Sequence, residues 1–133
     1  MANDAMVNRA SFERARAELG SNFVRILGYF REDGVKSVSA IEEAMRMCNA
    51  AAMVLPAHTL KGESRQFGAD PLSDLAETIE MIARDCIERH DEPSEALAHI
   101  VKLRPLFQAT LALLEREANP LVERRAVFGR RIS

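Results

Sequence analysis

The chain has 133 residues, of which 47% are hydrophobic and 29% are charged, and this balance is typical of one soluble globular domain rather than a disordered segment. The formal net charge of −2 is too balanced to indicate binding to nucleic acid. Aromatic residues make up only 5% and Trp is absent, while Ala, Leu, Glu and Arg are abundant. This composition favours helix, so we expect a single all-α domain over residues 1–133.

Cysteine placement and hydropathy indicate the compartment. Cys48 and Cys86 lie far apart, show no metal or redox spacing, and each falls on the apolar side of a helical pattern, so we interpret both as small core residues. No apolar run approaches the roughly 18 residues of a membrane span, and the N-terminus lacks the apolar segment of a signal peptide. These features predict a cytoplasmic protein that does not bind a membrane.

In the first part of the chain, apolar residues recur at helical spacing and predict three helices. Ser11 is the expected N-cap of a short helix that Gly20 ends. A second helix is expected to begin at Ser21 or Asn22 and to end near Asp33-Gly34. The third carries the apolar residues Val38, Ile41, Met45 and Cys48.

The same spacing predicts three more helices. The fourth is expected to run from a cap at Asn49 to about Phe67, with Gly68 beyond it. The sixth follows Pro93. The fifth has the most regular apolar stripe, which comprises Leu72, Leu75, Ala76, Ile79, Ile82, Ala83, Cys86 and Ile87. Because the connections are short, successive helices should be antiparallel.

Two prolines and the C-terminal segment interrupt this pattern. Pro56 and Pro105 lie inside the fourth and sixth helices, where each removes a backbone hydrogen bond. Since the apolar spacing continues across both, we expect kinks rather than chain reversals. From Asn119 onward the pattern ends, and residues 119–133 are predicted to form a loosely ordered basic tail. Its cations are Arg124, Arg125, Arg130 and Arg131.

The fourth helix combines a histidine, a cation and a glycine on one face. At 100° per residue, positions i, i+3, i+4 and i+7 share an outward-tilted face. Here these positions are His58, Lys61, Gly62 and Arg65. The predicted core stripe lies beside this face and comprises Met53, Ala57, Leu60, Ser64 and Phe67.

These residue types suit phosphoryl transfer. The imidazole of His58 offers a nucleophilic nitrogen. Lys61 is placed to neutralise the charge on phosphoryl oxygens. Gly62 costs up to about 1 kcal/mol relative to Ala in a helix interior, a cost that is explained if a partner must approach the helix there. Val54 and Leu55, one turn before His58, would supply apolar contacts for docking.

The fourth and fifth helices resemble those of histidine phosphotransfer (HPt) domains. The family signature, H-x-L-K-G-x(5)-G-A, is matched by His58-Thr59-Leu60-Lys61-Gly62 and Gly68-Ala69. The family's following helix is matched at Leu75, Ala76, Ile79 and Glu80. The resemblance implies an antiparallel up-down four-helix bundle with a core over residues 21–118. An additional short N-terminal helix would precede it, and the basic tail would follow.

The resemblance also implies the roles of individual residues. His58 would be phosphorylated, and Lys61 and Gly62 carry over directly. Glu80 occupies a position where the family has a polar residue, often Gln, that hydrogen-bonds the other ring nitrogen. A carboxylate there would orient the ring but would slightly repel an incoming phosphoryl group. Arg84, one turn later, is expected to compensate.

The partners and cofactors are likewise implied by the resemblance. The expected partners are receiver domains of response regulators, whose aspartate gives or takes the phosphoryl group, and hybrid or sensor histidine kinases. Val54, Leu55, Gly62 and Arg65 would form the contact surface. The chain would be a monomeric phosphocarrier of a multistep phosphorelay and not an enzyme. It would hold no metal or cofactor of its own, and Mg²⁺ is expected on the receiver.

Three alternatives remain at this point. The phosphoacceptor and dimerisation fragment of a histidine kinase usually has an acidic residue directly after the histidine, where Thr59 stands here, and a Pro a few residues later, whereas none occurs before Pro71. A carboxylate–histidine metal bundle needs paired Glu-x-x-His motifs, and Glu95 and His99 are spaced i+4 with no second pair. A receiver-binding adaptor without phosphotransfer would not need the intact His-Lys-Gly triplet.

Overall fold

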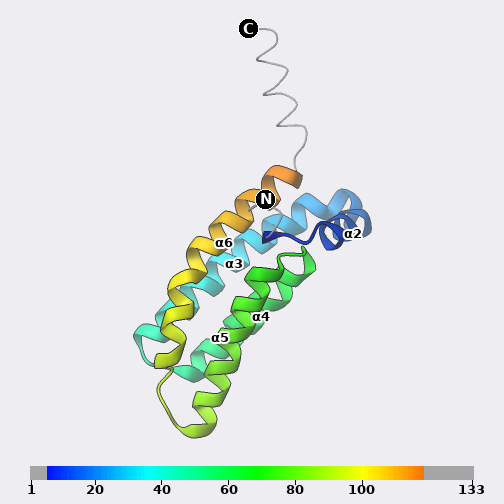
Figure 1. Cartoon of the computed structure of the whole chain (residues 1–133). Helices are drawn as coiled ribbons and strands as arrows, with labels where there is room; N and C mark the ends of the chain where they lie inside the picture. Colours follow the sequence, from blue (N-terminus) through cyan, green and yellow to red (C-terminus); the bar gives the residue numbers. More distant parts are fainter. Residues whose placement is uncertain (1–5, 119–133) are drawn as a thin grey trace.

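The structure, a computed structural model, describes residues 6–118 and contains five α-helices over that range (Figure 1). The helices are α2 (Arg9–Leu19), α3 (Phe23–Arg46), α4 (Ala50–Gln66), α5 (Asp70–Arg89) and α6 (Leu97–Ala118). Short 3₁₀ turns occupy Gly20–Asn22 and Ser94–Ala96. The predicted basic tail, residues 119–133, lies outside the described residues.

The four long helices form an antiparallel up-down bundle. α3, α4, α5 and α6 follow one another around the bundle, and α6 packs against both α5 and α3. Their apolar faces meet in one core, which includes the fully buried side chains of Ile41, Met53, Leu60, Ile79 and Leu103. α4 and α5 share the most extensive contact, so their adjoining faces are held in a fixed relation. The predicted all-α four-helix bundle is confirmed.

Phenylalanine rings tie the N-terminal helix to the bundle. The ring pairs Phe12–Phe23, Phe23–Phe67, Phe67–Phe30 and Phe30–Phe107 have centroid separations of 5.3 to 5.7 Å. Three of the four pairs meet edge to face, an arrangement that the ring quadrupole favours. This continuous series links α2, α3, the end of α4 and α6.

The second and third predicted helices are a single helix, so the expected break at Asp33-Gly34 is wrong. α3 runs unbroken through this dipeptide, and Gly34 is buried. A Cβ atom on Gly34 would overlap the ring of Phe107 from α6. The glycine therefore serves close packing between two helices and does not end one, a distinction that sequence spacing cannot make.

Gly34→Ala is expected to destabilise the protein although alanine favours helix more than glycine. The added methyl group collides with the Phe107 ring, and overpacking of this kind typically costs about 1–3 kcal/mol, more than the roughly 1 kcal/mol gained in propensity. Urea denaturation would measure the difference. Gly28→Ala on the same helix is the matched control, because its Cβ would meet nothing within 4 Å. Equal stability of the two variants would contradict this packing role.

Other local predictions were partly right. Gly20 ends α2 with φ of +55°, as expected, but the N-cap is Asn8 and not Ser11, since the Asn8 side chain accepts a 3.1 Å hydrogen bond from the Ser11 amide. Cys86 is buried, as predicted, whereas Cys48 is exposed. Cys48 lies two residues after Arg46, the last residue of α3, and has φ of +51°, so the helical period no longer places it on the core side.

The predicted cap of α4 and the predicted continuity of α4 and α6 across their prolines are confirmed. Asn49 caps α4, because its side chain accepts a 3.1 Å hydrogen bond from the Ala52 amide. Pro56 and Pro105 both lie inside continuous helices, so neither reverses the chain.

Within residues 6–118, one segment, Ser94–Ala118, is long and apolar enough by composition to cross a membrane, with a mean hydropathy of 1.2. This segment includes α6, and several of the apolar residues of α6 belong to the bundle core.

Candidate functional site

Helix α4 presents its core stripe and its polar face as the sequence predicted. Each residue of the predicted stripe is buried, namely Met53, Ala57, Leu60, Ser64 and Phe67. His58 lies off this stripe, and 56% of its side chain is exposed. The histidine is therefore accessible to a partner while its helix is fixed by the core.

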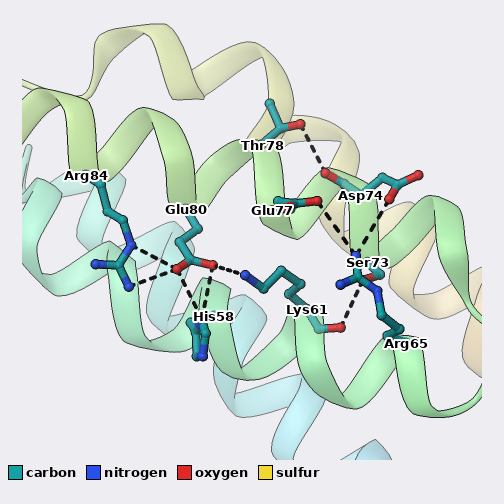
Figure 2. Close-up of polar contacts among 9 residues, drawn as sticks. All are labelled: His58, Lys61, Arg65, Ser73, Asp74, Glu77, Thr78, Glu80 and Arg84. Carbon is teal, nitrogen blue, oxygen red and sulfur yellow. Dashed lines mark hydrogen bonds and ion pairs between the residues drawn. The ribbon is translucent and has the colours of Figure 1, made fainter.

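Glu80 on α5 holds the imidazole of His58. Nδ1 lies 3.1 Å from Oε2 and 3.2 Å from Oε1 of the carboxylate, and the Glu80 side chain is only 6% exposed. Figure 2 shows the ring directed at the carboxylate. A carboxylate facing Nδ1 selects the tautomer with hydrogen on that nitrogen, so Nε2 is left with its lone pair.

The same carboxylate binds two cations. Lys61 Nζ lies 2.8 Å from Glu80 Oε1, and the Arg84 Nε and Nη2 atoms each lie 2.9 Å from Oε2 (Figure 2). The sequence predicted Lys61 as a cation for phosphoryl oxygens, and did not predict that it bonds Glu80. Two cations against one carboxylate leave one positive charge beside His58, which offsets the expected repulsion of a phosphoryl group.

Glu80 is ionised at neutral pH. Burial acts to raise the pKa of its carboxyl group, but hydrogen bonds from Lys61, Arg84 and His58 outweigh burial and lower this pKa to about 2. Because the folded-state pKa lies below the ordinary value of 4.5, the interaction stabilises the fold above that pH. The stability it provides is lost as the pH falls from 4.5 towards 2.

Ser73 fixes the α4 backbone next to Gly62 and was missed by sequence reasoning. Its hydroxyl donates a 3.0 Å hydrogen bond to the carbonyl oxygen of Lys61, and the side chain is fully buried on α5. The bond joins α5 to α4 at the residue whose ammonium group reaches Glu80 (Figure 2). The sequence feature that could have indicated this role is the position of the Ser73 hydroxyl next to the apolar stripe of the fifth predicted helix.

The predicted docking residues differ in exposure. A Cβ on Gly62 would meet nothing within 4 Å, so the helix surface is open there. Leu55 is 72% exposed, whereas Val54 is half-buried and packs against the core. Arg65 Nη2 lies 3.7 Å from Glu77 and 4.0 Å from Asp74 on α5. The open surface beside His58 is thus formed by Leu55, Gly62 and Arg65.

Glu63, the residue after Gly62, differs from Glu80 because no cation pairs with its carboxyl group within residues 6–118. It is half-buried, its Oε1 is enclosed, and that oxygen has no hydrogen-bond partner among the described residues. Burial, together with the neighbouring carboxyl group of Asp33, raises the pKa of Glu63 to about 7. Because this value lies above the ordinary 4.5, stability falls as the pH rises from 4.5 through 7.

Glu63→Gln is therefore expected to stabilise the protein at pH 8 and to have a much smaller effect at pH 5. The amide removes the cost of ionising a partly buried group, on the order of 1–3 kcal/mol after allowance for solvent screening. Urea denaturation at both pH values measures the effect, with Glu13→Gln on exposed α2 surface as the control. A gain of equal size at both pH values would show that ionisation of Glu63 is not the cause.

The bundle, with an exposed histidine held by a buried carboxylate and two cations, has the architecture of a histidine phosphotransfer domain. The family model of the Hpt domain matches residues 25–118, and the chain belongs to this family. It is therefore a histidine phosphotransfer protein, a phosphocarrier of phosphorelays. No curated protein matches the chain.

A solved structure confirms the fold. The chain is similar to the crystal structure of histidine-containing phosphotransfer protein B (HptB) from Pseudomonas aeruginosa PAO1, with a TM-score of 0.76 and 20% sequence identity. The alignment covers 86% of this chain and 96% of that one. Helix α2 lies outside residues 25–118, the part matched by the family model. Among the described residues, no group of three or more His, Cys, Asp or Glu side chains could hold a metal ion.

Proposed function

We propose that the protein carries a phosphoryl group on Nε2 of His58 and exchanges it with the aspartate of a receiver domain. The observation that carries this proposal is the contact between His58 Nδ1 and the buried Glu80 carboxylate at 3.1 Å. That contact fixes the ring and leaves Nε2 as the nucleophile on a side chain that is 56% exposed.

The transfer step follows from this geometry. The Nε2 lone pair attacks the phosphorus of a receiver's phosphoaspartate, the P–N bond forms, the P–O bond to aspartate breaks, and the aspartate carboxylate leaves. The hydrogen on Nδ1 stays in contact with Glu80, whose negative charge stabilises the positive ring of phosphohistidine. Lys61 and Arg84, both within reach of Glu80, are the cations nearest the transferred oxygens. The reverse transfer uses the same contacts.

The partners are receiver domains and, upstream, hybrid or sensor histidine kinases. We infer that they dock on the surface formed by Leu55, Gly62 and Arg65, because it adjoins His58 along α4. Mg²⁺ belongs to the receiver in this scheme, and this chain acts as a cytoplasmic monomer. The test is phosphotransfer profiling: the protein is incubated with each phosphorylated receiver domain of the same organism, and label is followed over time. Transfer from none of them would contradict the proposal.

Gly62→Gln is expected to weaken receiver binding about tenfold or more, equivalent to at least about 1.4 kcal/mol, because the side chain fills the open helix surface beside His58. Gly62→Ala should keep binding and raise stability by up to about 1 kcal/mol. Receiver affinity and melting temperature of both variants separate docking from folding. Ala112→Gln, at an exposed position of α6, controls for added bulk. Unchanged affinity of Gly62→Gln would remove the clearance role.

A further inference from the structure

A groove lies between α2 and the C-terminal end of α4. Its α2 side includes Ser11, Arg14 and Glu18, and its α4 side consists of Arg65 and Gln66. The groove does not belong to the cluster around Glu80, and its α2 side lies outside residues 25–118, which match the family model. The groove is therefore formed partly by residues that the family model matches, on α4, and partly by residues that it does not match, on α2.

The groove lies on the same side of α4 as His58. At 100° per residue, Arg65 and Gln66 point to either side of the direction shared by His58 and Gly62. Arg65 follows His58 by seven residues, a separation of about 10 Å along the helix axis at 1.5 Å per residue. One surface thus continues from His58 over Gly62 to the groove (Figure 2 shows His58 and Arg65 on the same helix).

Helix α2 is fixed against the bundle, so the groove is preformed. The Asn8 amide donates a 2.7 Å hydrogen bond to the Gly68 carbonyl, in the turn between α4 and α5. Gly68 has φ of +75°, and a Cβ there would lie 2.7 Å from the Asn8 carbonyl oxygen. At the other end, Arg16 Nη1 donates a 3.1 Å hydrogen bond to the Glu117 carbonyl of α6. Figure 1 shows α2 beside this end of the bundle.

We propose that a receiver docked over His58 also contacts this groove, and that Arg14 binds an acidic side chain of the receiver. This inference rests on the proposed function. A standard interface buries about 800 Å² per partner, equivalent to a disc of about 16 Å radius, which extends past Arg65 when centred on His58. Within residues 6–118 the exposed Arg14 guanidinium makes no ion pair, whereas Arg65 lies near Asp74 and Glu77. Arg14 is thus the cation available to a partner.

The test is charge reversal at Arg14. Arg14→Glu should weaken binding of the receiver found by phosphotransfer profiling tenfold or more at low salt, and less at high salt. Arg14→Lys should bind nearly as well as the wild type. The melting temperature and the rate at which phosphoramidate, a small-molecule donor, phosphorylates His58 should not change in either variant. Lys102→Glu is the matched control, because it makes the same charge change at an exposed site on α6, a helix that shares no extensive contact with α4.

Two results would overturn the inference. One is unchanged receiver affinity in Arg14→Glu. The other is an equal loss in Lys102→Glu, which would attribute the effect to overall charge. A wild-type protein that phosphoramidate phosphorylates but that exchanges with no receiver would overturn the proposed function itself. The two failures are therefore distinguishable.

Discussion

Replacing His58 by Ala is expected to abolish phosphoryl acceptance while leaving the helical content unchanged. The side chain is 56% exposed and lies off the core stripe of α4, so its removal creates no cavity. The other nitrogens that contact Glu80 in the described part of the chain belong to the cations Lys61 and Arg84, which are not nucleophiles. Incubation with a phosphorylated receiver, followed by gel detection of label, measures acceptance, and circular dichroism measures helix content.

The chain offers a matched control for this experiment, because it has three histidines. A double variant with His90→Asn and His99→Gln keeps His58 alone and should accept phosphoryl as well as the wild type. Asn is chosen for His90 because that residue has φ of +58°, a conformation that Asn tolerates. Acceptance by His58→Ala, or its loss in the double variant, would place the phosphoryl group elsewhere.

Glu80→Ala is expected to slow phosphotransfer tenfold or more and to destabilise the fold by about 3 kcal/mol at pH 7. The variant frees the His58 ring and leaves Lys61, which is 19% exposed, without its anion. The destabilisation follows from the lowered pKa of Glu80, about 2 against 4.5, which measures how strongly its partners favour the charged form. Transfer rates with the receiver and urea denaturation test both effects.

Glu80→Gln separates orientation of the ring from charge. The amide oxygen can still accept hydrogen bonds, so transfer should recover to within a few fold of the wild type. The loss of stability between pH 4.5 and 2 that Glu80 contributes to the wild type should disappear. Glu88→Ala on the same helix is the control, because Glu88 is exposed and makes no ion pair within residues 6–118. Wild-type transfer rates in Glu80→Ala would exclude a positioning role.

The bundle and the centre of the site could be predicted because their signals are local. The stripe Met53, Ala57, Leu60, Ser64 and Phe67 is a single helical period, and burial follows from it. His58 and Lys61 share a short motif on the same helix. Glu80 was placed through the family resemblance, and the structure brings it to within 3.1 Å of His58. The role of these residues in transfer stays a prediction.

What could not be predicted depends on contacts between helices. Gly34 resembles a helix end until Phe107 of α6 is packed on it, and this pairing spans 73 positions. The Ser73 hydroxyl acquires its role only when it faces the Lys61 carbonyl. Glu63 is an ordinary acidic residue in the sequence, and its raised pKa arises from enclosure between helices next to Asp33. Spacing within one helix contains none of this information.

The most direct test of the central claim is to identify the phosphorylated atom. The ¹⁵N-labelled protein would be phosphorylated by its receiver and examined by NMR, which distinguishes the two ring nitrogens. The account predicts a single phosphoryl group on Nε2 of His58, with hydrogen retained on Nδ1 opposite Glu80, and a label that is acid-labile and base-stable. Phosphorylation on Nδ1, or an acid-stable label on Ser64, would contradict it.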